Sequence, residues 1–120
     1  MAPGEIGVDV FGDIEEIICK EYRLVAPEPV KLEVQKLSRK RGKEGRAAKI
    51  ALELMEREGV EIIRTERMEG DASIVELARR VERPVIATND KKLREGFRSR
   101  SVPTLFIRTE DHVKLEGDIR

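Results

Sequence analysis

The stretch VIATNDKKL, residues 85–93, joins an apolar run to a helix-forming run through three polar residues. Its first residues are typical of a strand, and the two lysines with Leu93 resume a helical pattern. Thr88, Asn89 and Asp90 lie at the junction. Asp90 has two interpretations: it caps the following helix, or it belongs to a ligand site, because open α/β sheets bind ligands outside the carboxyl ends of their strands. The two roles are compatible.

Short β-rich runs alternate with amphipathic runs along the rest of the 120 residues. This alternation predicts a single α/β domain in which a parallel sheet is flanked by helices on both faces. Gly59 is a natural C-cap for the helix around 47–55. The residues from Asp111 onward are either a frayed tail or a short strand. Strands are predicted at 22–26, 60–65, 84–88 and 103–108, and helices at 8–20, from Pro29, around 47–55, from Asp71 and at 90–99. The predicted inward-facing helix residues are Val10, Phe11, Ile14, Ile17, Ile18, Val30, Val34, Leu37, Ala47, Ile50, Ala51, Leu54, Met55, Ile74, Leu77, Ala78 and Val81.

The composition excludes several kinds of site. Cys19 and His112 are the only cysteine and histidine, so a disulfide framework is excluded, a zinc cluster or a Ser-His-Asp triad is hard to build, and acid chemistry must come from carboxylates. Charged residues make up 40% of the chain with basic and acidic residues balanced, which is typical of proteins from hot environments with many surface ion pairs. No run approaches the roughly 20 apolar residues of a membrane helix, and no signal-peptide pattern opens the chain. We therefore expect a cytoplasmic protein without a membrane segment.

Three carboxylates follow predicted strands. Asp90 comes two residues after the third strand, Asp71 opens the helix after the second, and Glu33 lies in the first turns of the helix after the first. The carboxyl ends of parallel strands share one rim of a sheet, so we expect these three side chains to converge. Converging carboxylates repel one another unless a cation lies among them, and oxygen ligands of this kind favour Mg²⁺ or Mn²⁺. Such an ion activates water against a phosphodiester, with Thr88 and Asn89 orienting the water or the phosphate.

Each of these residues also has a purely structural interpretation. Asp71 and Asp90 are both N-cap candidates for the helices that they precede. Glu33 lies at the edge of the apolar stripe of its helix, where an ion pair with Lys36 on the surface is the simpler role. Only the joint placement of the three acids on one rim favours the metal site.

A cluster of basic residues lies between residues 36 and 49, where seven basic side chains face a single acid, Glu44. A phosphate backbone near an acidic metal rim requires such a segment, and the alternative is a solvated helix face. The basic residues of the segment are Lys36, Arg39, Lys40, Arg41, Lys43, Arg46 and Lys49. Of these, Arg39, Lys40, Arg41, Lys43 and Arg46 are the candidate nucleic-acid contacts, together with Lys91 and Lys92 at the start of the helix after Asp90.

These residues together resemble the PIN-domain nucleases, and within them archaeal proteins similar to the branch that processes small-subunit ribosomal RNA. The resemblance implies a three-layer sandwich with a parallel sheet and a metal-dependent endoribonuclease whose acidic positions match Glu33, Asp71 and Asp90. It covers nearly all of the chain, in the segments GVDVFGDIEEI, LVAPEPVKLEVQKLS, RGKEGRAAKIALELME, GDASIVELA, VIATNDKKLR and VPTLFIR.

One part of the family pattern is missing. These proteins usually begin with a short apolar strand that ends in Asp-Thr-Asn and lies in the middle of the sheet, and this sequence starts just after that position. Asp9 and Asp13 match helix positions and do not replace the absent acid. We expect the true start of the gene to lie upstream of Met1. If the short form is real, the gap is closed by direct strand pairing, by the tail around His112–Leu115, or by exchange between subunits of a homodimer.

Three functions remain open. The first is an Mg²⁺- or Mn²⁺-dependent ribonuclease that cleaves RNA during ribosomal RNA processing, in contact with ribosome-assembly proteins. The second is a catalytically incomplete RNA-binding or scaffold module that keeps the fold and the basic segment. The third is the toxin of a toxin–antitoxin pair, which shares the chemistry of the first and adds an antitoxin partner.

Overall fold

The computed structural model describes the backbone of residues 3–109 and 112–119, with the side chains of 11–107 and 113–119. The chain divides into two units. One contains Met1–Gly7 and Tyr22–Arg80, and the other contains Val8–Glu21 and Val81–Arg120. The first helix, α1 (Pro3–Ile18), contributes to both, and Pro3 suits its first turn. None of the described helices is long and apolar enough to cross a membrane.

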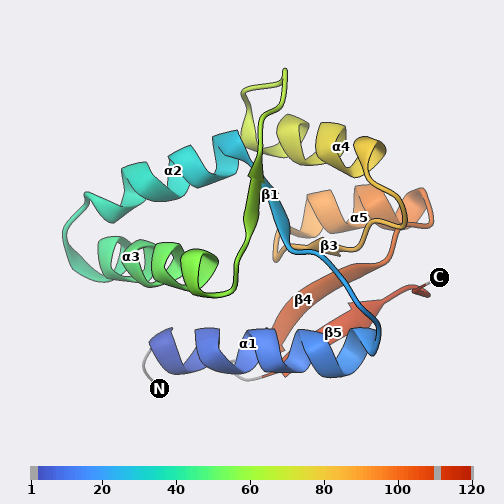
Figure 1. Cartoon of the computed structure of the whole chain (residues 1–120), viewed down its shortest axis with the longest axis horizontal. Coiled ribbons are helices and arrows are strands. Elements are labelled where there is room, and N and C mark those ends of the chain that lie inside the picture. The colour runs from blue at the N-terminus through green and yellow to red at the C-terminus, as the bar shows by residue number, and fades with distance from the viewer. Residues whose placement is uncertain (1–2, 110–111, 120) are drawn as a thin grey trace. The chain divides into compact units, whose positions relative to one another are not determined.

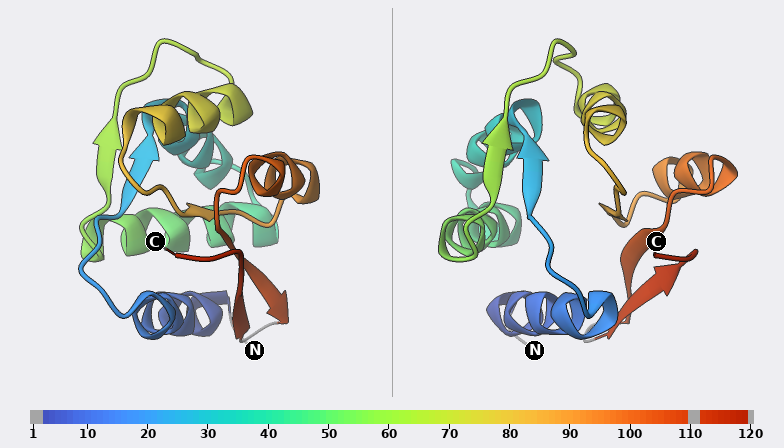
Figure 2. Two further views of the ribbon diagram at one scale, coloured as in Figure 1. Left: turned by 90° about the vertical axis from the view of Figure 1, so that its right-hand side faces the viewer. Right: turned by 45° about the vertical axis from the view of Figure 1, so that its right-hand side comes forward.

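The unit that contains Tyr22–Arg80 is built on a parallel pair of short strands. Figure 1 shows α2 and α3 side by side as a helical hairpin between these strands in sequence, and Figure 2 shows both strand arrows pointing the same way. Helix α4 contacts α2 and β1. The elements are β1 (Val25–Pro27), α2 (Glu28–Ser38), α3 (Gly42–Arg57), β2 (Glu61–Ile63) and α4 (Gly70–Arg80).

Helix α3 ends as its sequence predicts, and its predicted inward-facing stripe differs from the structure at one position, Ala47. The N–H of Gly59 donates to Glu56 and that of Val60 to Met55, at 3.2 and 2.9 Å, while Gly59 takes a positive φ of 68°. This is a Schellman ending, so the predicted C-cap is confirmed. The prediction that Ala47 faces inward is wrong, because Ala47 is exposed and Ala48 is 7% exposed.

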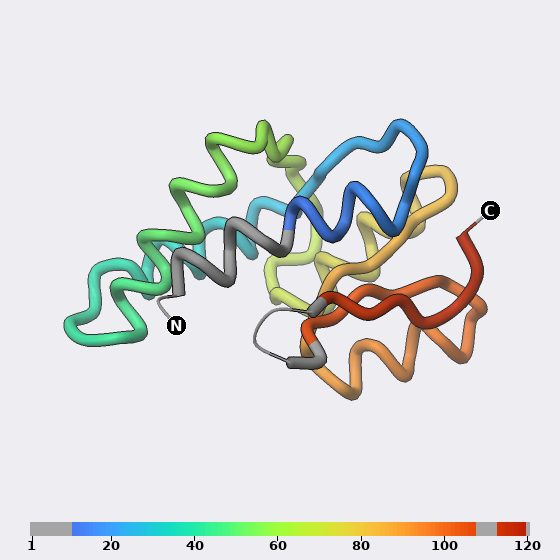
Figure 3. The backbone as a smooth tube through the Cα atoms, turned by 90° about the horizontal axis from the view of Figure 1, so that it is seen from below, coloured from blue at the N-terminus to red at the C-terminus, as the bar shows by residue number. Residues whose placement is uncertain are grey.

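The second unit combines a parallel and an antiparallel strand pair around a small core. Strand β4 lies between β3, its parallel partner, and β5, its antiparallel partner, and Figure 3 shows the β4–β5 hairpin beside α5. The buried apolar side chains are Ile14 of α1, Phe97 of α5 and Leu105 of β4. The remaining elements are β3 (Ile86–Ala87), α5 (Lys91–Ser99), β4 (Thr104–Thr109) and β5 (His112–Glu116).

The described strands form two sheets where a single parallel sheet was predicted. Strands β1 and β3 each pair with a neighbour on one side only, and the direct strand pairing considered above is not formed among the described strands. The C-terminal segment is a strand, as one alternative predicted, but it pairs with β4 and so does not extend β1. Ile14 and Leu77 are buried as predicted, whereas most other predicted core residues are half-buried, and Val10 lies outside the described side chains.

Arg94 ties α5 to both strands of the β4–β5 hairpin. Its guanidinium carbon lies 3.9 Å from the centroid of the Phe106 ring, and its Nη1 donates to Glu116 Oε1 at 3.2 Å. The Arg94 side chain is only 18% exposed, so the cation–π contact is partly desolvated and contributes about 0.5–1 kcal/mol or more. The charge on α5 therefore supports the packing of the sheet.

A carboxylate clamp fixes the connection between β2 and α4. Both oxygens of Glu76 accept the N–H of Glu66 at 3.0 Å, and Oε1 also accepts that of Arg67 at 2.8 Å. Arg80 Nη1 donates to Glu76 Oε2 at 3.2 Å and to the Arg64 carbonyl at 2.9 Å. The backbone N–H of Arg67, followed by that of Glu66, holds the pKa of Glu76 below its ordinary value of 4.5.

Replacing Gly45 with alanine tests the contact between α3 and the turn before it. A Cβ at the buried Gly45 would overlap the carbonyl oxygen of Lys40, whereas one at Gly96 of α5 meets open space. We expect Gly45→Ala to lower the free energy of unfolding by about 1–3 kcal/mol through this overlap. The matched Gly96→Ala should raise it by about 1 kcal/mol through helix propensity alone. Urea denaturation of both variants checks the opposite signs, and stabilisation by Gly45→Ala would disprove the close contact.

Replacing Glu76 with glutamine tests the clamp. A lowered pKa stabilises the fold above its ordinary value, and this stabilisation is lost as the pH falls through the lowered value. We therefore expect the wild type to resist urea better than Glu76→Gln at neutral pH, and the difference to shrink as the pH falls below 4.5. Glu53→Gln, at an exposed position of α3, is the control and should show no such trend. The same gap between wild type and Glu76→Gln at neutral and acidic pH would count against the clamp.

Candidate functional site

The junction at residues 85–93 is held by a continuous series of hydrogen bonds. The N–H of Ile86 donates to Pro103 at 3.1 Å and that of Thr88 to Leu105 at 3.0 Å, which carries the β3–β4 ladder to the end of the strand. Asp90 then has an extended backbone, and its Oδ1 accepts the N–H of Leu93 at 3.0 Å. The predicted capping role of Asp90 is therefore confirmed. Its other carboxylate oxygen has no hydrogen-bond partner among the described residues, and the side chain is exposed.

Thr88 and Asn89 shape the turn that presents Asp90. Thr88 Oγ1 accepts the N–H of Asp90 at 3.2 Å. Asn89 Oδ1 accepts the N–H of Ile107 at 2.8 Å, so this side chain takes the place of a further strand residue opposite β4. Both residues position the backbone around Asp90. Their predicted contact with a water molecule or a phosphate stays a prediction.

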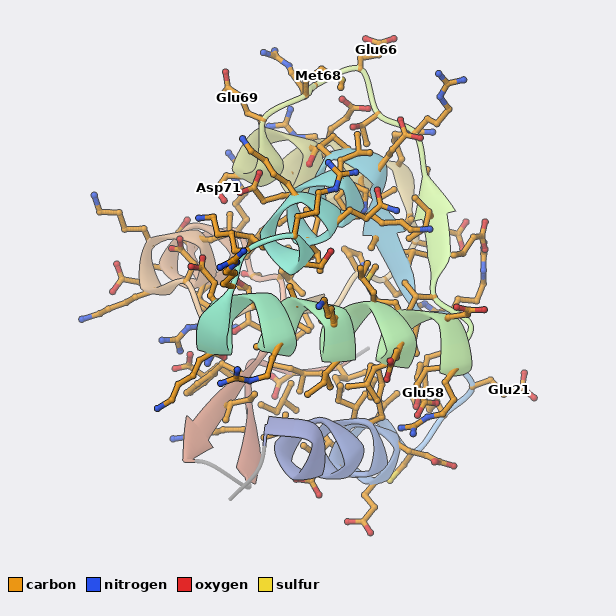
Figure 4. The ribbon with its side chains drawn as sticks, turned by 90° about the vertical axis from the view of Figure 1, so that its left-hand side faces the viewer. Glu21, Glu58, Glu66, Met68, Glu69 and Asp71 are labelled. Carbon is orange, nitrogen blue, oxygen red and sulfur yellow. The ribbon has the colours of Figure 1, made fainter. Side chains whose placement is uncertain are left out.

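Asp71 is a free carboxylate in the first turn of α4. The helix begins one residue earlier, at Gly70, and its first turn is closed by the Ser73 hydroxyl, which donates to the Gly70 carbonyl at 2.7 Å. The exposed Asp71 side chain makes no hydrogen bond or ion pair within the described residues (Figure 4). The N-cap interpretation of Asp71 is therefore wrong, and its charge is available at the positive end of the helix.

Glu33 is also uncommitted. It lies on the exposed side of α2, and no ion pair with Lys36 is formed, so that alternative is wrong as well. Helices α2 and α4 contact each other, which places Glu33 and Asp71 in the same unit, while Asp90 belongs to the other.

The donor chemistry of these residues fits a hard divalent cation. Carboxylate oxygens are the ligands that Mg²⁺ and Mn²⁺ prefer, and Glu33 and Asp71 have no competing partner in the part of the chain that the structure describes. Within that same part, no three acidic, histidine or cysteine side chains are grouped as a metal site. The convergence of Glu33, Asp71 and Asp90 on one rim thus stays a prediction.

The basic segment occupies the end of α2, the turn, and the first half of α3. All seven of its basic side chains are exposed, and one described ion pair involves them, between Lys40 Nζ and Glu44 Oε1 at 3.8 Å. Lys91 and Lys92 are exposed in the first turn of α5, where positive charge opposes the helix dipole. Asp90 offsets this unfavourable placement, since it supplies a negative charge at the same helix end.

A group of four arginines with no sequence signature lies along α4 and the loop before it. Arg64 and Arg67 come from the loop after β2, and Arg79 and Arg80 from the last turn of α4, around one groove. The two pairs are separated by more than ten residues, so no local pattern marks them. The sequence offers only two short basic pairs as a signal, Arg64 with Arg67 and Arg79 with Arg80.

Comparison with known proteins agrees with this architecture. A family model described as a PIN-like domain matches residues 1–110. Ribonuclease VapC9 of Archaeoglobus fulgidus is 35% identical over 109 residues, which are 90% of this chain and 76% of the relative. Ribonuclease VapC4 of Methanocaldococcus jannaschii is 26% identical over 108 residues, 88% of this chain and 81% of the relative.

The solved structure of the PIN domain endonuclease Utp24 shares the fold, with a TM-score of 0.74 at 22% sequence identity over 96% of this chain and 83% of that one. The family model and the 35% identical relative confirm the resemblance to the PIN-domain nucleases. With a family model that spans nearly its whole length and a relative above one-third identity, this chain belongs to the PIN-like domain family.

Proposed function

We propose that this protein is an endoribonuclease that requires Mg²⁺ or Mn²⁺, with Glu33, Asp71 and Asp90 as ligands. The observation that carries the proposal is the 35% identity to a protein named as a ribonuclease, over 90% of this chain. A bound divalent ion would supply activation of water and stabilisation of negative charge on the phosphodiester oxygens. This chain supplies the carboxylates that hold it.

The state of the three carboxylates supports this assignment. Glu33 and Asp71 are exposed and form no ion pair within the described residues. Many basic residues are near them in this highly charged sequence, so the lack of an ion pair leaves both carboxylates available to a metal ion. Asp90 caps α5 through a single oxygen, which leaves the other for a ligand. The Thr88 and Asn89 hydrogen bonds fix the backbone of Asp90, and a rigid backbone keeps a ligand at the required position.

The basic segment at the α2–α3 turn supports RNA as the substrate. Six of its seven basic side chains have no described ion pair, so binding a phosphate there does not first require an internal ion pair to break. Lys91 and Lys92 add positive charge beside Asp90. Both lysines lie in the first turn of α5, where the helix dipole disfavours positive charge. Contact with a polyanion explains this placement better than folding does.

Two biological roles fit such an activity, ribosomal RNA processing and the RNA cleavage of a toxin that is restrained by an antitoxin. The names of the two relatives favour ribonuclease activity without choosing between these roles. The second candidate function is an RNA-binding module without catalysis. The exposed basic segment at the α2–α3 turn, which needs no metal ion to bind RNA, is the observation that favours this candidate.

Replacing Asp90 with asparagine separates the cap from the chemistry. Asparagine caps helices as well as aspartate, so Asp90→Asn should keep the cap and remove the ligand charge. The melting temperature should fall only slightly, because the negative charge beside Lys91 and Lys92 is lost. We expect Mn²⁺-dependent cleavage of RNA to fall by about 100-fold or more, because even residues that only support metal ligands cost about 10- to 100-fold. Cleavage is measured on a labelled RNA with and without EDTA.

The matched control is Glu95→Gln, which removes an exposed carboxylate from the same helix and should cleave as the wild type does. Unchanged cleavage by Asp90→Asn would remove Asp90 from the mechanism. RNA binding that weakens steeply with salt, with no cleavage in either divalent ion and no metal-induced rise in melting temperature, would establish the non-catalytic alternative.

A further inference from the structure

One face of α4 and the loop before it form a groove of about 820 Å³. The loop backbone at residues 64–67 is hydrogen-bonded to Glu76 and Arg80 of the helix, and residues of both the loop and the helix line the groove. Glu66, Met68 and Glu69 project outward from this loop, away from the rest of the unit (Figure 4). The charged residues that line the groove are Arg64, Glu66, Arg67, Glu76, Arg79 and Arg80.

The groove is rigidly constructed. The Glu76 clamp holds the backbone of Glu66 and Arg67, and Arg80 holds the Arg64 carbonyl. These hydrogen bonds join the loop to the helix at three backbone positions. A ligand that binds here does not have to order the loop, and the free energy of ordering is among the main costs of binding.

The charges in the groove are unevenly used. Glu76 is satisfied by the loop N–H groups and by Arg80, so that pair is internally balanced. Arg64 Nε lies 3.9 Å from Glu28 Oε1, and the Arg64 side chain is 89% exposed, so this ion pair is weak. Arg67 and Arg79 are exposed and have no ion pair within the described residues. The groove therefore presents two guanidinium groups without an ion pair over a small apolar floor, Ala72 and Val75. One carboxylate of the lining, that of Glu66, is also without an ion pair within the described residues, and it projects outward from the loop.

We propose that this groove binds the phosphate backbone of an RNA strand, with Arg67 and Arg79 as the phosphate contacts. The proposal rests on the proposed function, because it extends the path of the RNA away from Asp71. The guanidinium fork matches two oxygens of a phosphate, which makes arginine the preferred residue for this ligand. An acidic peptide is disfavoured, since Ala72 and Val75 bury little apolar surface and the groove has no aromatic anchor.

The position along α4 agrees with this path. Asp71 and Arg79 are eight residues apart in the same helix, which corresponds to about 12 Å along its axis. Ala72, at one end of the groove, directly follows Asp71 in the sequence. An RNA strand bound at Arg79 therefore reaches Asp71 within a short length of its phosphate backbone.

The test is RNA binding by the Arg67→Ala, Arg79→Ala double variant. Fluorescence anisotropy of a labelled 2′-O-methyl RNA oligonucleotide, in EDTA, measures affinity without cleavage or metal. We expect affinity to fall about 10-fold, and the slope of log affinity against log salt to become shallower by about 0.7 for each phosphate that the variant no longer binds. The control Arg83→Ala, Arg100→Ala removes the same charge from exposed positions of the other unit and should change neither quantity.

Three results would overturn the proposal. The first is wild-type affinity and salt slope in the Arg67, Arg79 variant. The second is an equal loss of affinity in the control, which would reflect general electrostatics. The third is that a glutamate-rich peptide binds the protein and loses affinity in the double variant, while the RNA affinity stays unchanged. Equal melting temperatures by circular dichroism confirm that each variant is folded.

The proposed nuclease activity fails separately. If no divalent ion supports cleavage but the double variant still binds RNA more weakly, the groove assignment stands and the catalytic one falls. If Asp71→Asn abolishes cleavage and keeps RNA binding, while the double variant raises KM with little change in kcat, both assignments are supported.

Discussion

Two parallel strands that are neighbours in a sheet cannot be joined by a tight turn, and this constraint determines where the functional side chains lie. The chain must return to the starting end of the sheet through a crossover of a dozen or more residues. Helices α2 and α3 make that return between β1 and β2, and α5 makes it between β3 and β4. Each crossover begins at the carboxyl end of a strand. After β1 the chain enters α2 at Pro27 without a side-chain cap, whereas after β3 polar residues end the ladder and start α5. Asp90 occupies such a position, and its capping hydrogen bond to Leu93 follows from it directly.

The sequence predicted those features that depend on hydrogen bonds between residues close together in the chain. The strand, turn and helix of residues 85–93 and the glycine ending of α3 follow from backbone groups that neighbouring residues satisfy, so the sequence marks them. The choice between Ala47 and Ala48 depends on which side of α3 meets the rest of its unit, and two adjacent alanines do not distinguish the sides. The Glu76 clamp was not predicted either. Its partners are backbone N–H groups nine and ten residues away in an irregular loop. Every residue type except proline carries such a group, so the residue types do not identify the partners.

The candidate site was predicted as a set of residue types but not as an arrangement. Three acids placed after strands identify the chemistry of a metal ligand. Whether a given acid is already committed to a cap or an ion pair depends on distances that periodicity does not supply. The structure separates these cases: Asp90 caps its helix, whereas Asp71 and Glu33 do not take the structural roles considered for them. Similarly, a net charge of zero conceals the segregation of charge, because the α2–α3 turn and the α4 groove both gather cations within one unit.

The open edges of β1 and β3 bear on the solution behaviour of the protein. An unpaired strand edge offers backbone donors and acceptors to any extended chain, and such edges seed intermolecular β-sheets. Two features limit this tendency here. Pro27 ends β1 and lacks the N–H that a new partner would need, and β3 is only two residues long. At these two edges, resistance to intermolecular pairing depends on one imino acid and on the shortness of one strand, so colloidal stability is sensitive to changes at positions that are remote from any proposed chemistry.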